Sequence, residues 1–167
     1  MSLFKLDSSY NDHLDFQLLQ NGWANLYWQE NILLSHLEWF KKENYKIVEL
    51  DCANWTATNR LLYELGLLLD FPDYYGKNLD ALNDCLSHIE INDSGTVVVF
   101  KHFQVVEKSF AHTLLDIFAL NARRHLLFGK KLLMLVQVDD ADYKIDLIGA
   151  TPVLWNDAES LDTARGV

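Results

Sequence analysis

Carboxylate side chains gather in one short stretch of the sequence, between Asp70 and Asp93. Six acidic residues stand there against a single base, Lys77, which leaves five negative charges (six minus one) in a chain whose formal net charge is −10. Such a cluster attracts cationic partners and repels nucleic-acid phosphates, although acidity can equally serve to keep a protein soluble. The six acids are Asp70, Asp73, Asp80, Asp84, Glu90 and Asp93.

The segment 78–89 has the spacing of a short helix that presents two of these acids on one face. Its apolar residues recur three and four positions apart and should face the core: they are Leu79, Leu82, Cys85, Leu86 and Ile89. Asp80, Asn83, Asp84 and Ser87 lie on the other face. Like charges four apart on a helix cost about 0.2–0.5 kcal/mol. Asp80 lies in the first turn, where a negative charge complements the helix dipole. Asp84 lies beyond that turn, so no local interaction offsets its repulsion of Asp80. An uncompensated local cost of this kind is typical of a functional surface.

The loop before this helix adds two adjacent tyrosines and a glycine. We expect one of Tyr74 and Tyr75 to be buried and the other to stand exposed beside Gly76, whose missing Cβ permits close approach of a partner. Tyrosine beside carboxylates favours recognition of a cationic partner. The alternative is an acidic helix that starts after a tight turn, with Asn78 as its N-cap.

Sequence motifs of catalysis and of cofactor binding are missing. There is no Gly-x-Ser-x-Gly elbow, no phosphate-binding glycine loop and no His-Glu-x-x-His, and the six histidines have no metal-ligand spacing. The acids 139–142 lack the rest of a calcium loop and indicate a solvated turn. We therefore expect no cofactor, no metal and no enzymatic activity. Cys52 and Cys85 are expected to be buried, reduced thiols.

The elements that must position the acidic helix alternate between strand and helix. Strands are expected at 23–28, 45–50, 96–100 and 132–138, with one or two short strands within 145–155. Helices are expected at 29–44, 56–70, 78–89 and 107–128. This order predicts an α/β fold with a largely parallel sheet.

The helix at 56–70 is expected to begin at a cap, Thr56, and to bury one stripe of leucines. The stripe consists of Leu61, Leu62, Leu65, Leu68 and Leu69. A chain of 167 residues fits one domain, 1–167. It has no signal-peptide pattern and no run of about 18 apolar residues, which favours a cytoplasmic location.

The segment 71–86 strongly resembles the barstar family, intracellular inhibitors of the ribonuclease barnase. The matching residues are Pro72, Tyr74 to Gly76, Asn78 to Leu82 and Asp84 to Leu86. The resemblance covers roughly 45–138, so that 1–44 and 139–167 are additions packed on a barstar-like core. It implies a small parallel β-sheet packed with helices, extended here by an N-terminal βα unit and by C-terminal strand additions.

The resemblance also implies an active-site plug, in which acidic side chains take the place of substrate phosphate. Asp80 and Asp84 match the family's two acidic anchors, and Asp84 matches the one that enters the phosphate-binding pocket. The resemblance thus implies inhibition of a basic nuclease, a ribonuclease toxin, by a monomeric immunity or antitoxin-type protein. The expected partner-binding residues are Tyr74, Gly76, Asn78, Leu79, Asp80, Asn83 and Asp84.

Two positions depart from the family pattern. Asn83 stands where barstar carries an interface tryptophan, and Leu120 aligns with another interface glutamate. The acidic anchors are therefore kept while the rim of the interface has changed. These departures favour a basic nuclease toxin other than barnase as the partner.

Two other classes of function remain open. The first is a non-inhibitory barstar-like interaction or regulatory module, a dimer if Trp23, Trp28, Trp39 and Trp155 build an interface instead of completing the core. The second is an enzyme, which would need a pocket that gathers Asp84, Tyr74 and His88 around a small ligand. A flat or convex surface at these residues would remove the enzyme.

Overall fold

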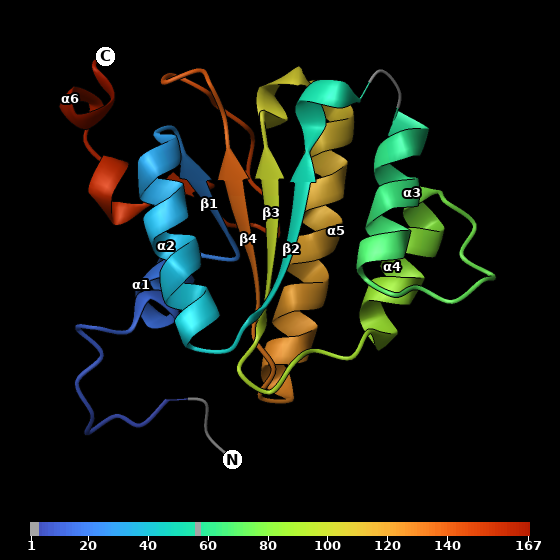
Figure 1. Ribbon diagram of the computed structural model, residues 1–167, viewed down its shortest axis with the longest axis horizontal. Helices are drawn as coiled ribbons and strands as arrows, with labels where there is room; N and C mark the ends of the chain where they lie inside the picture. The colour runs from blue at the N-terminus through green and yellow to red at the C-terminus, as the bar shows by residue number, and fades with distance from the viewer. Residues whose placement is uncertain (1–3, 56–57) are drawn as a thin grey trace.

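The protein is an α/β structure built on one parallel sheet (Figure 1). The computed structural model describes residues 4–55 and 58–167. Five strands lie in the order β2-β3-β4-β1-β5, and each neighbouring pair is parallel. Their bounds are β1 Ala24–Tyr27, β2 Lys46–Asp51, β3 Thr96–Lys101, β4 Leu132–Gln137 and β5 Leu154–Trp155. The fold class predicted from the sequence is confirmed.

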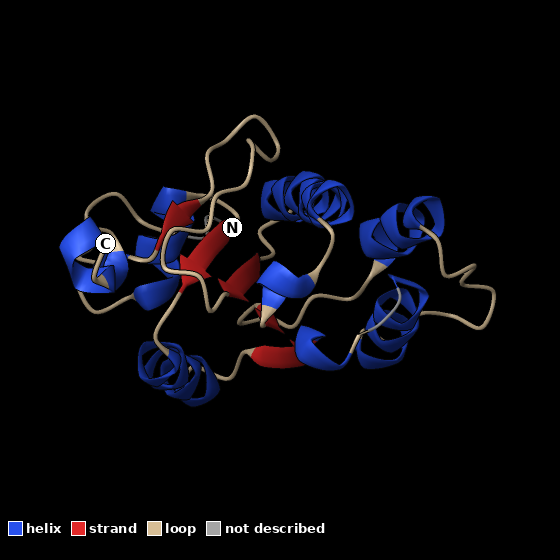
Figure 2. Cartoon of the chain, turned by 90° about the horizontal axis from the view of Figure 1, so that it is seen from above, coloured by secondary structure: helices blue, strands red, loops and turns tan. Residues whose placement is uncertain are grey.

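Helices cover both faces of the sheet, as the view from above shows (Figure 2). On one face lie α1 (Leu14–Asn21) and α2 (Glu30–Lys42), and on the other lies α5 (Lys108–Leu127) with α3 (Thr58–Leu68) and α4 (Leu79–His88) beside it (Figure 1). A short helix, α6 (Asp162–Arg165), closes the chain. Single 3-10 turns follow β2, β3 and β5, at Cys52–Asn54, Phe103–Val105 and Asp157–Glu159.

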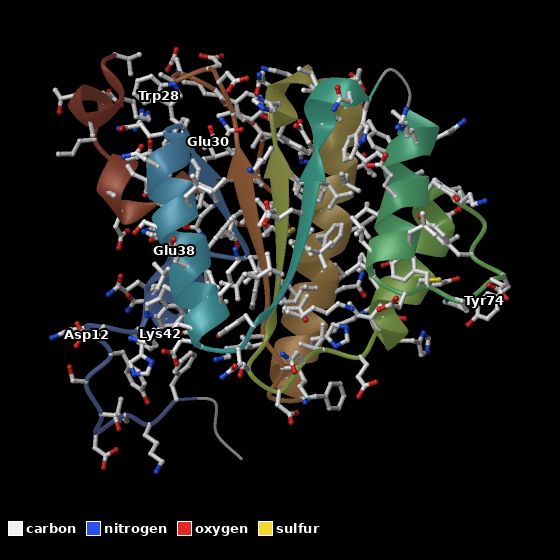
Figure 3. The ribbon with its side chains drawn as sticks, in the orientation of Figure 1. Asp12, Trp28, Glu30, Glu38, Lys42 and Tyr74 are labelled. Carbon is white, nitrogen blue, oxygen red and sulfur yellow. The ribbon has the colours of Figure 1, made fainter. Side chains whose placement is uncertain are left out.

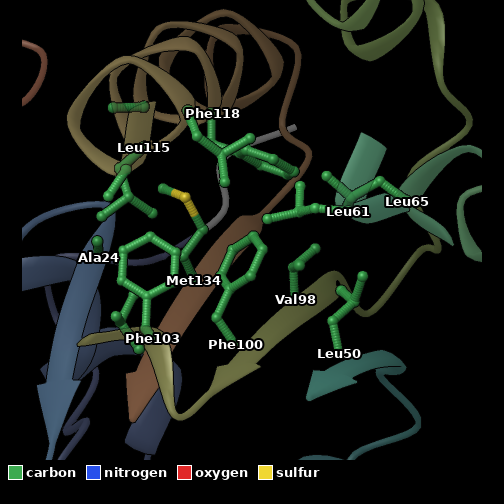
Figure 4. Close-up of a cluster of buried hydrophobic side chains, with 14 of the residues drawn as sticks. Ala24, Leu50, Leu61, Leu65, Val98, Phe100, Phe103, Leu115, Phe118 and Met134 are labelled. Atoms are coloured by element: carbon green, nitrogen blue, oxygen red, sulfur yellow. The ribbon is translucent and has the colours of Figure 1, made fainter. Parts of the chain in front are cut away.

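Two hydrophobic cores fill the space between the sheet and its helices. The larger lies under α3, α4 and α5, where Phe100 of β3 meets Phe118 of α5 edge to face with ring centroids 5.8 Å apart (Figure 4). The smaller lies under α1 and α2 and includes Tyr27, Leu33 and Phe40. Because both faces of the sheet are covered, β3 and β4 are almost wholly buried, which explains their continuous apolar sequences.

Several details differ from the sequence prediction. In the leucine stripe of α3, Leu61, Leu62, Leu65 and Leu69 are buried, but Leu68 is 42% exposed. Leu68 is the last residue of the helix and lies beside the exposed Leu67, on the solvent side of its last turn. The predicted cap Thr56 lies outside the described residues. Cys52 and Cys85 are buried free thiols, as expected.

The N-terminal segment contains a helix, α1, that the sequence did not predict. Its buried Asp15 accepts hydrogen bonds from the Tyr45 hydroxyl (2.5 Å) and from Lys131 Nζ (2.6 Å). Burial alone would raise the pKa of Asp15, but the hydrogen bonds from Lys131 and Tyr45 hold it below its usual value. This buried ion pair fastens the N-terminal addition to the strand ends of the core.

The C-terminal addition is fastened in a similar way at the opposite end of the sheet. The fully buried carboxylate of Glu159 accepts from the main-chain N–H groups of Trp28 (3.0 Å) and Gln29 (2.7 Å), which precede α2. Arg165 lies over the ring of Trp155, 4.3 Å from its centroid. The N-terminal addition is therefore fastened to the core, and the C-terminal addition is fastened to the N-terminal one, through β1 and the start of α2.

Candidate partner-binding site

The helix α4 forms where the sequence places it, and a side chain caps it. Asn78 Oδ1 accepts from the main-chain N–H of Ala81 at 2.8 Å, so the predicted N-cap is confirmed. Leu82, Cys85 and Leu86 are buried, while Leu79 and Ile89 are partly buried against the same core. The opposite side of α4 therefore stays free to face solvent.

The two tyrosines of the preceding loop separate as expected. Tyr75 is only 8% exposed, and its ring fills the space over Gly66 of α3, where an added Cβ would lie 2.7 Å from the ring. Burial raises the pKa of the Tyr75 hydroxyl to about 12. Tyr74 is 85% exposed and points away from the molecule (Figure 3). The buried tyrosine thus anchors the loop that presents the exposed one.

The two acidic residues of α4 are exposed and carry uncompensated charge. Asp80 lies in the first turn and Asp84 one turn later. Among the described residues, neither carboxylate has an ion-pair partner. Gly76 and Asn78 are exposed beside them, and Leu79 is partly buried. Exposed, unpaired carboxylates next to an exposed tyrosine can receive cationic groups from a partner.

Asn83 differs from its predicted neighbours because it turns toward α5. Asn121 of α5 is fully buried, and its Nδ2 donates to the carbonyl of Ile117 and to Asn83 Oδ1, both at 2.9 Å. The Ile117 carbonyl only accepts, so it fixes which end of the Asn121 amide faces Asn83. Asn83 must then present its oxygen to Asn121 and turn its own NH₂ group elsewhere. The partly exposed Leu120 lies next to Asn121 on α5.

A groove opens beside these residues, between the ends of α3 and α4. Its volume is about 920 Å³. A flat surface here would have excluded the enzyme alternative. Because the surface is concave, its shape does not exclude that alternative. However, His88 Nδ1 lies 2.8 Å from Ser87 Oγ and 3.0 Å from the main-chain oxygen of Asp84. The imidazole therefore does not pair with the Asp84 carboxylate as an acid–base couple would require.

A polar cluster at the carboxyl ends of β3 and β4 was missed in the sequence. His102 Nδ1 lies 2.8 Å from Asp139 Oδ2, and the hydrogen bond to Asp139 raises the pKa of His102. Gln104 and Gln137 also donate to Asp139. The sequence did contain a signal for this cluster, because His102 and Asp139 each follow a predicted buried strand. Adjacent parallel strands bring the residues at their carboxyl ends together. No group of residues in the described part of the chain could hold a metal ion.

The structure defines a class of protein: an α/β domain that exposes an acidic helix and a tyrosine loop from a packed core. The family described as Barstar (barnase inhibitor) matches residues 45–137, more than half of the chain. The chain belongs to the barstar family. This match confirms the resemblance and runs from just before β2 to the end of β4.

A curated relative matches part of the same region. A Bacillus subtilis (strain 168) protein named "Putative ribonuclease inhibitor YrdF" is 47% identical over 51 residues. The aligned segment spans 30% of this chain and 48% of that relative. The chain thus covers about half the length of the curated relative it matches.

No helix within the described residues is long and apolar enough to cross a membrane.

Proposed function

We propose that this protein inhibits a basic nuclease, a ribonuclease toxin, by docking the α4 face on the enzyme's active site. The observation that carries the proposal is the pair of exposed, unpaired carboxylates, Asp80 and Asp84, beside Tyr74, in a member of the barstar family. The similarity to a protein named as a ribonuclease inhibitor supports the same role. The proposed contacts are Tyr74, Gly76, Asn78, Leu79, Asp80, Asn83 and Asp84.

The mechanism is stoichiometric occupation of a phosphate site by carboxylates. An active site that binds RNA presents Arg, Lys or His to phosphate, and a carboxylate forms charge-assisted hydrogen bonds with the same groups. Asp84 would occupy the phosphate position because it projects from the middle of α4, with Asp80 one turn before it. The formal net charge of −10 would steer association, which should slow as salt is added.

The biological setting belongs to the same proposal. An inhibitor of a toxin that cells make themselves would act as an immunity or antitoxin-type protein in the cytoplasm. We propose that residues 1–167 form one domain and act as a monomer. The partial burial of Trp23, Trp39 and Trp155 against the two cores supports the monomer, since these rings are already packed within the chain.

Replacing the central anchor tests the proposal. We expect Asp84→Ala to weaken binding to the cognate nuclease by at least about 100-fold, because a partner cation would lose its desolvated carboxylate. Isothermal titration calorimetry and an RNA-cleavage assay would measure the effect. Asp146→Ala is the matched control, because it removes one exposed acid that lies far along the chain from α4. Unchanged affinity of Asp84→Ala would contradict the docking mode.

A further inference from the structure

The groove beside Asp84 has chemistry that the active-site plug does not use. We propose that it receives a long cationic side chain, Arg or Lys, that the partner nuclease carries outside its active site. The inference rests on the proposed function, since it assigns a second contact to the same partner. The groove is lined by Lys46, Leu69, Asp70, Phe71, Pro72, Tyr74, Asp84, Cys85, His88, Ile89, Glu90 and Asn92.

The lining combines apolar residues with acids, which suits a side chain with methylenes and a charged end. Leu69, Phe71 and Ile89 supply apolar surface, and Cys85 is a neutral buried thiol, because burial raises its pKa. Long basic side chains lay their methylenes along apolar surface while their charged ends reach polar groups. A purely anionic ligand would find no such match here.

The charges around the groove favour a cation. Three acids, Asp70, Asp84 and Glu90, line it against Lys46 and His88. Lys46 Nζ lies 3.0 Å from Asp70 Oδ2, so these two charges largely neutralise each other. The carboxylates of Asp84 and Glu90 have no ion-pair partner among the described residues. When Asp84 pairs with the active site of the nuclease, Glu90 is the unpaired carboxylate of the groove that remains for a second cation.

Two helix ends add to this field. Leu69 and Asp70 follow the last residue of α3 directly, and His88 is the last residue of α4, so both helices end at the groove. The carboxyl end of a helix carries roughly half a negative charge, which stabilises a nearby cation. This contribution is independent of the acidic side chains and has the same sign.

A buried hydroxyl close to the lining also lacks a partner. The ring of Tyr75 packs against Phe71 with centroids 4.9 Å apart, and its hydroxyl lies near enough to Cys85 for the thiol to affect its pKa. Among the described residues, this hydroxyl has no hydrogen-bond partner. Tyr75 does not line the groove and its hydroxyl is buried, so this unpaired group lies behind the lining and is not a direct contact for the occupant.

The position of the groove favours a protein side chain as its occupant. Tyr74 and Asp84 belong both to the groove and to the proposed nuclease contacts. A nuclease docked on Asp84 would therefore lie over part of the groove and could insert a basic residue beside Glu90, which also lines it. The groove would then help to select one nuclease among those with similar active sites.

Small probes test the groove without knowledge of the nuclease. We would titrate the isotope-labelled protein with Nα-acetylarginine amide and follow backbone amides by NMR, with Nα-acetylcitrulline amide as the uncharged analogue of the same shape. The expected result is saturable shifts confined to the groove with the arginine probe, and a dissociation constant at least about fivefold higher in Glu90→Gln. Asp140→Asn, which removes the charge of an exposed acid outside the groove, should leave the shifts unchanged. Equal shifts with citrulline, or no localised shifts, would overturn the inference.

A second measurement separates this inference from the proposed function. In complex with the cognate nuclease, the arginine-induced shifts should disappear and Glu90→Gln should weaken the complex about three- to tenfold. If Asp84→Ala loses nuclease binding but Glu90→Gln does not, only the groove contact is wrong. If Asp84→Ala binds as tightly as the native chain, the proposed function fails, whatever the groove binds.

Discussion

At the scale of single residues, the orientation of one amide sets the hydrogen-bonding pattern of the binding face. The Ile117 carbonyl orients Asn121, Asn121 orients Asn83, and the NH₂ group of Asn83 is left for a partner. The face therefore offers acceptors at Asp80 and Asp84 and a donor at Asn83. A partner that binds this face as proposed would have to match both kinds of group.

The substitution Asn83→Asp tests this pattern with almost no change of shape. The new carboxylate can still accept from Asn121, but it loses the free donor and places a third acid beside Asp80 and Asp84. We expect nuclease binding to weaken about tenfold, or about 1.4 kcal/mol, by calorimetry. Asn54→Asp, an exposed site on the turn after β2, adds the same charge as a control. A gain in affinity would show that charge outweighs the donor.

At the scale of elements, the contact between α3 and the tyrosine loop depends on a glycine. In Gly66→Ala, the new Cβ would lie 2.7 Å from the Tyr75 ring, so the ring and the loop must move. We expect overpacking to cost about 1–3 kcal/mol, offset by up to about 1 kcal/mol of helix preference for Ala. Denaturant unfolding measures the net loss. Leu67→Ala, at the next and exposed position, should change stability by less than about 0.5 kcal/mol.

The hydrogen bond between His102 and Asp139, at the carboxyl ends of β3 and β4, should make the free energy of unfolding depend on pH. The hydrogen bond to Asp139 raises the pKa of His102, with further contributions from Asp51 and Glu30, and the same bond lowers the pKa of Asp139. The His102 contribution is therefore complete below its unfolded pKa, about 6.5, and is lost as pH rises through the raised folded value. The Asp139 contribution is present above about 3.8 and is lost in stronger acid.

The variant His102→Asn should reveal this dependence. Asn tolerates the left-handed backbone at this position, where φ is +52°, so the variant removes the titrating group without adding backbone strain. The stability difference between native and variant proteins should be larger at pH 5.5 than at pH 9 in urea unfolding. A difference that grows toward pH 9 would contradict the assigned direction.

Elements defined by local pattern were predictable, while those defined by distant partners were not. The apolar run of β3 and the cap at Asn78 follow from neighbouring residues, and the structure confirms both. The turn of Asn83 away from Asp84 depends on Asn121, 38 residues further along the chain. Likewise α1 is only eight residues long, and its Asp15 finds Lys131 only after folding. The barstar resemblance predicted a binding face, which stays a prediction, but it could not predict these contacts.

At the scale of the whole molecule, a buried ion pair joins the N-terminal addition to the core. Asp15→Ala would leave Lys131 and Tyr45 without their partner in a largely buried site. Removing one member of a buried pair costs about 3–5 kcal/mol, so we expect a clear fall in stability by calorimetric or denaturant unfolding. Asp12→Ala, an exposed neighbour, is the matched control.

The same experiment tests whether residues 1–167 form one domain. If the additions fold together with the core, Asp15→Ala should shift a single transition seen alike by tryptophan fluorescence and far-ultraviolet circular dichroism. Two separate transitions, with the core transition unchanged, would contradict one domain. The pairing of β1 with β4 within the single sheet supports a single transition.

The order of the strands affects how strongly this protein tends to aggregate at high concentration, because it decides which strands lie at the edges of the sheet. An inhibitor that acts one-to-one must be present in at least equal numbers with its target, which invites self-association. Here one outermost strand, β2, carries Lys46, Glu49 and Asp51, and the other, β5, is two residues long. Charged or very short edge strands discourage the addition of strands from other molecules. The sheet edges thus resist aggregation, which would matter at high concentration if the protein acts as the one-to-one inhibitor that we propose.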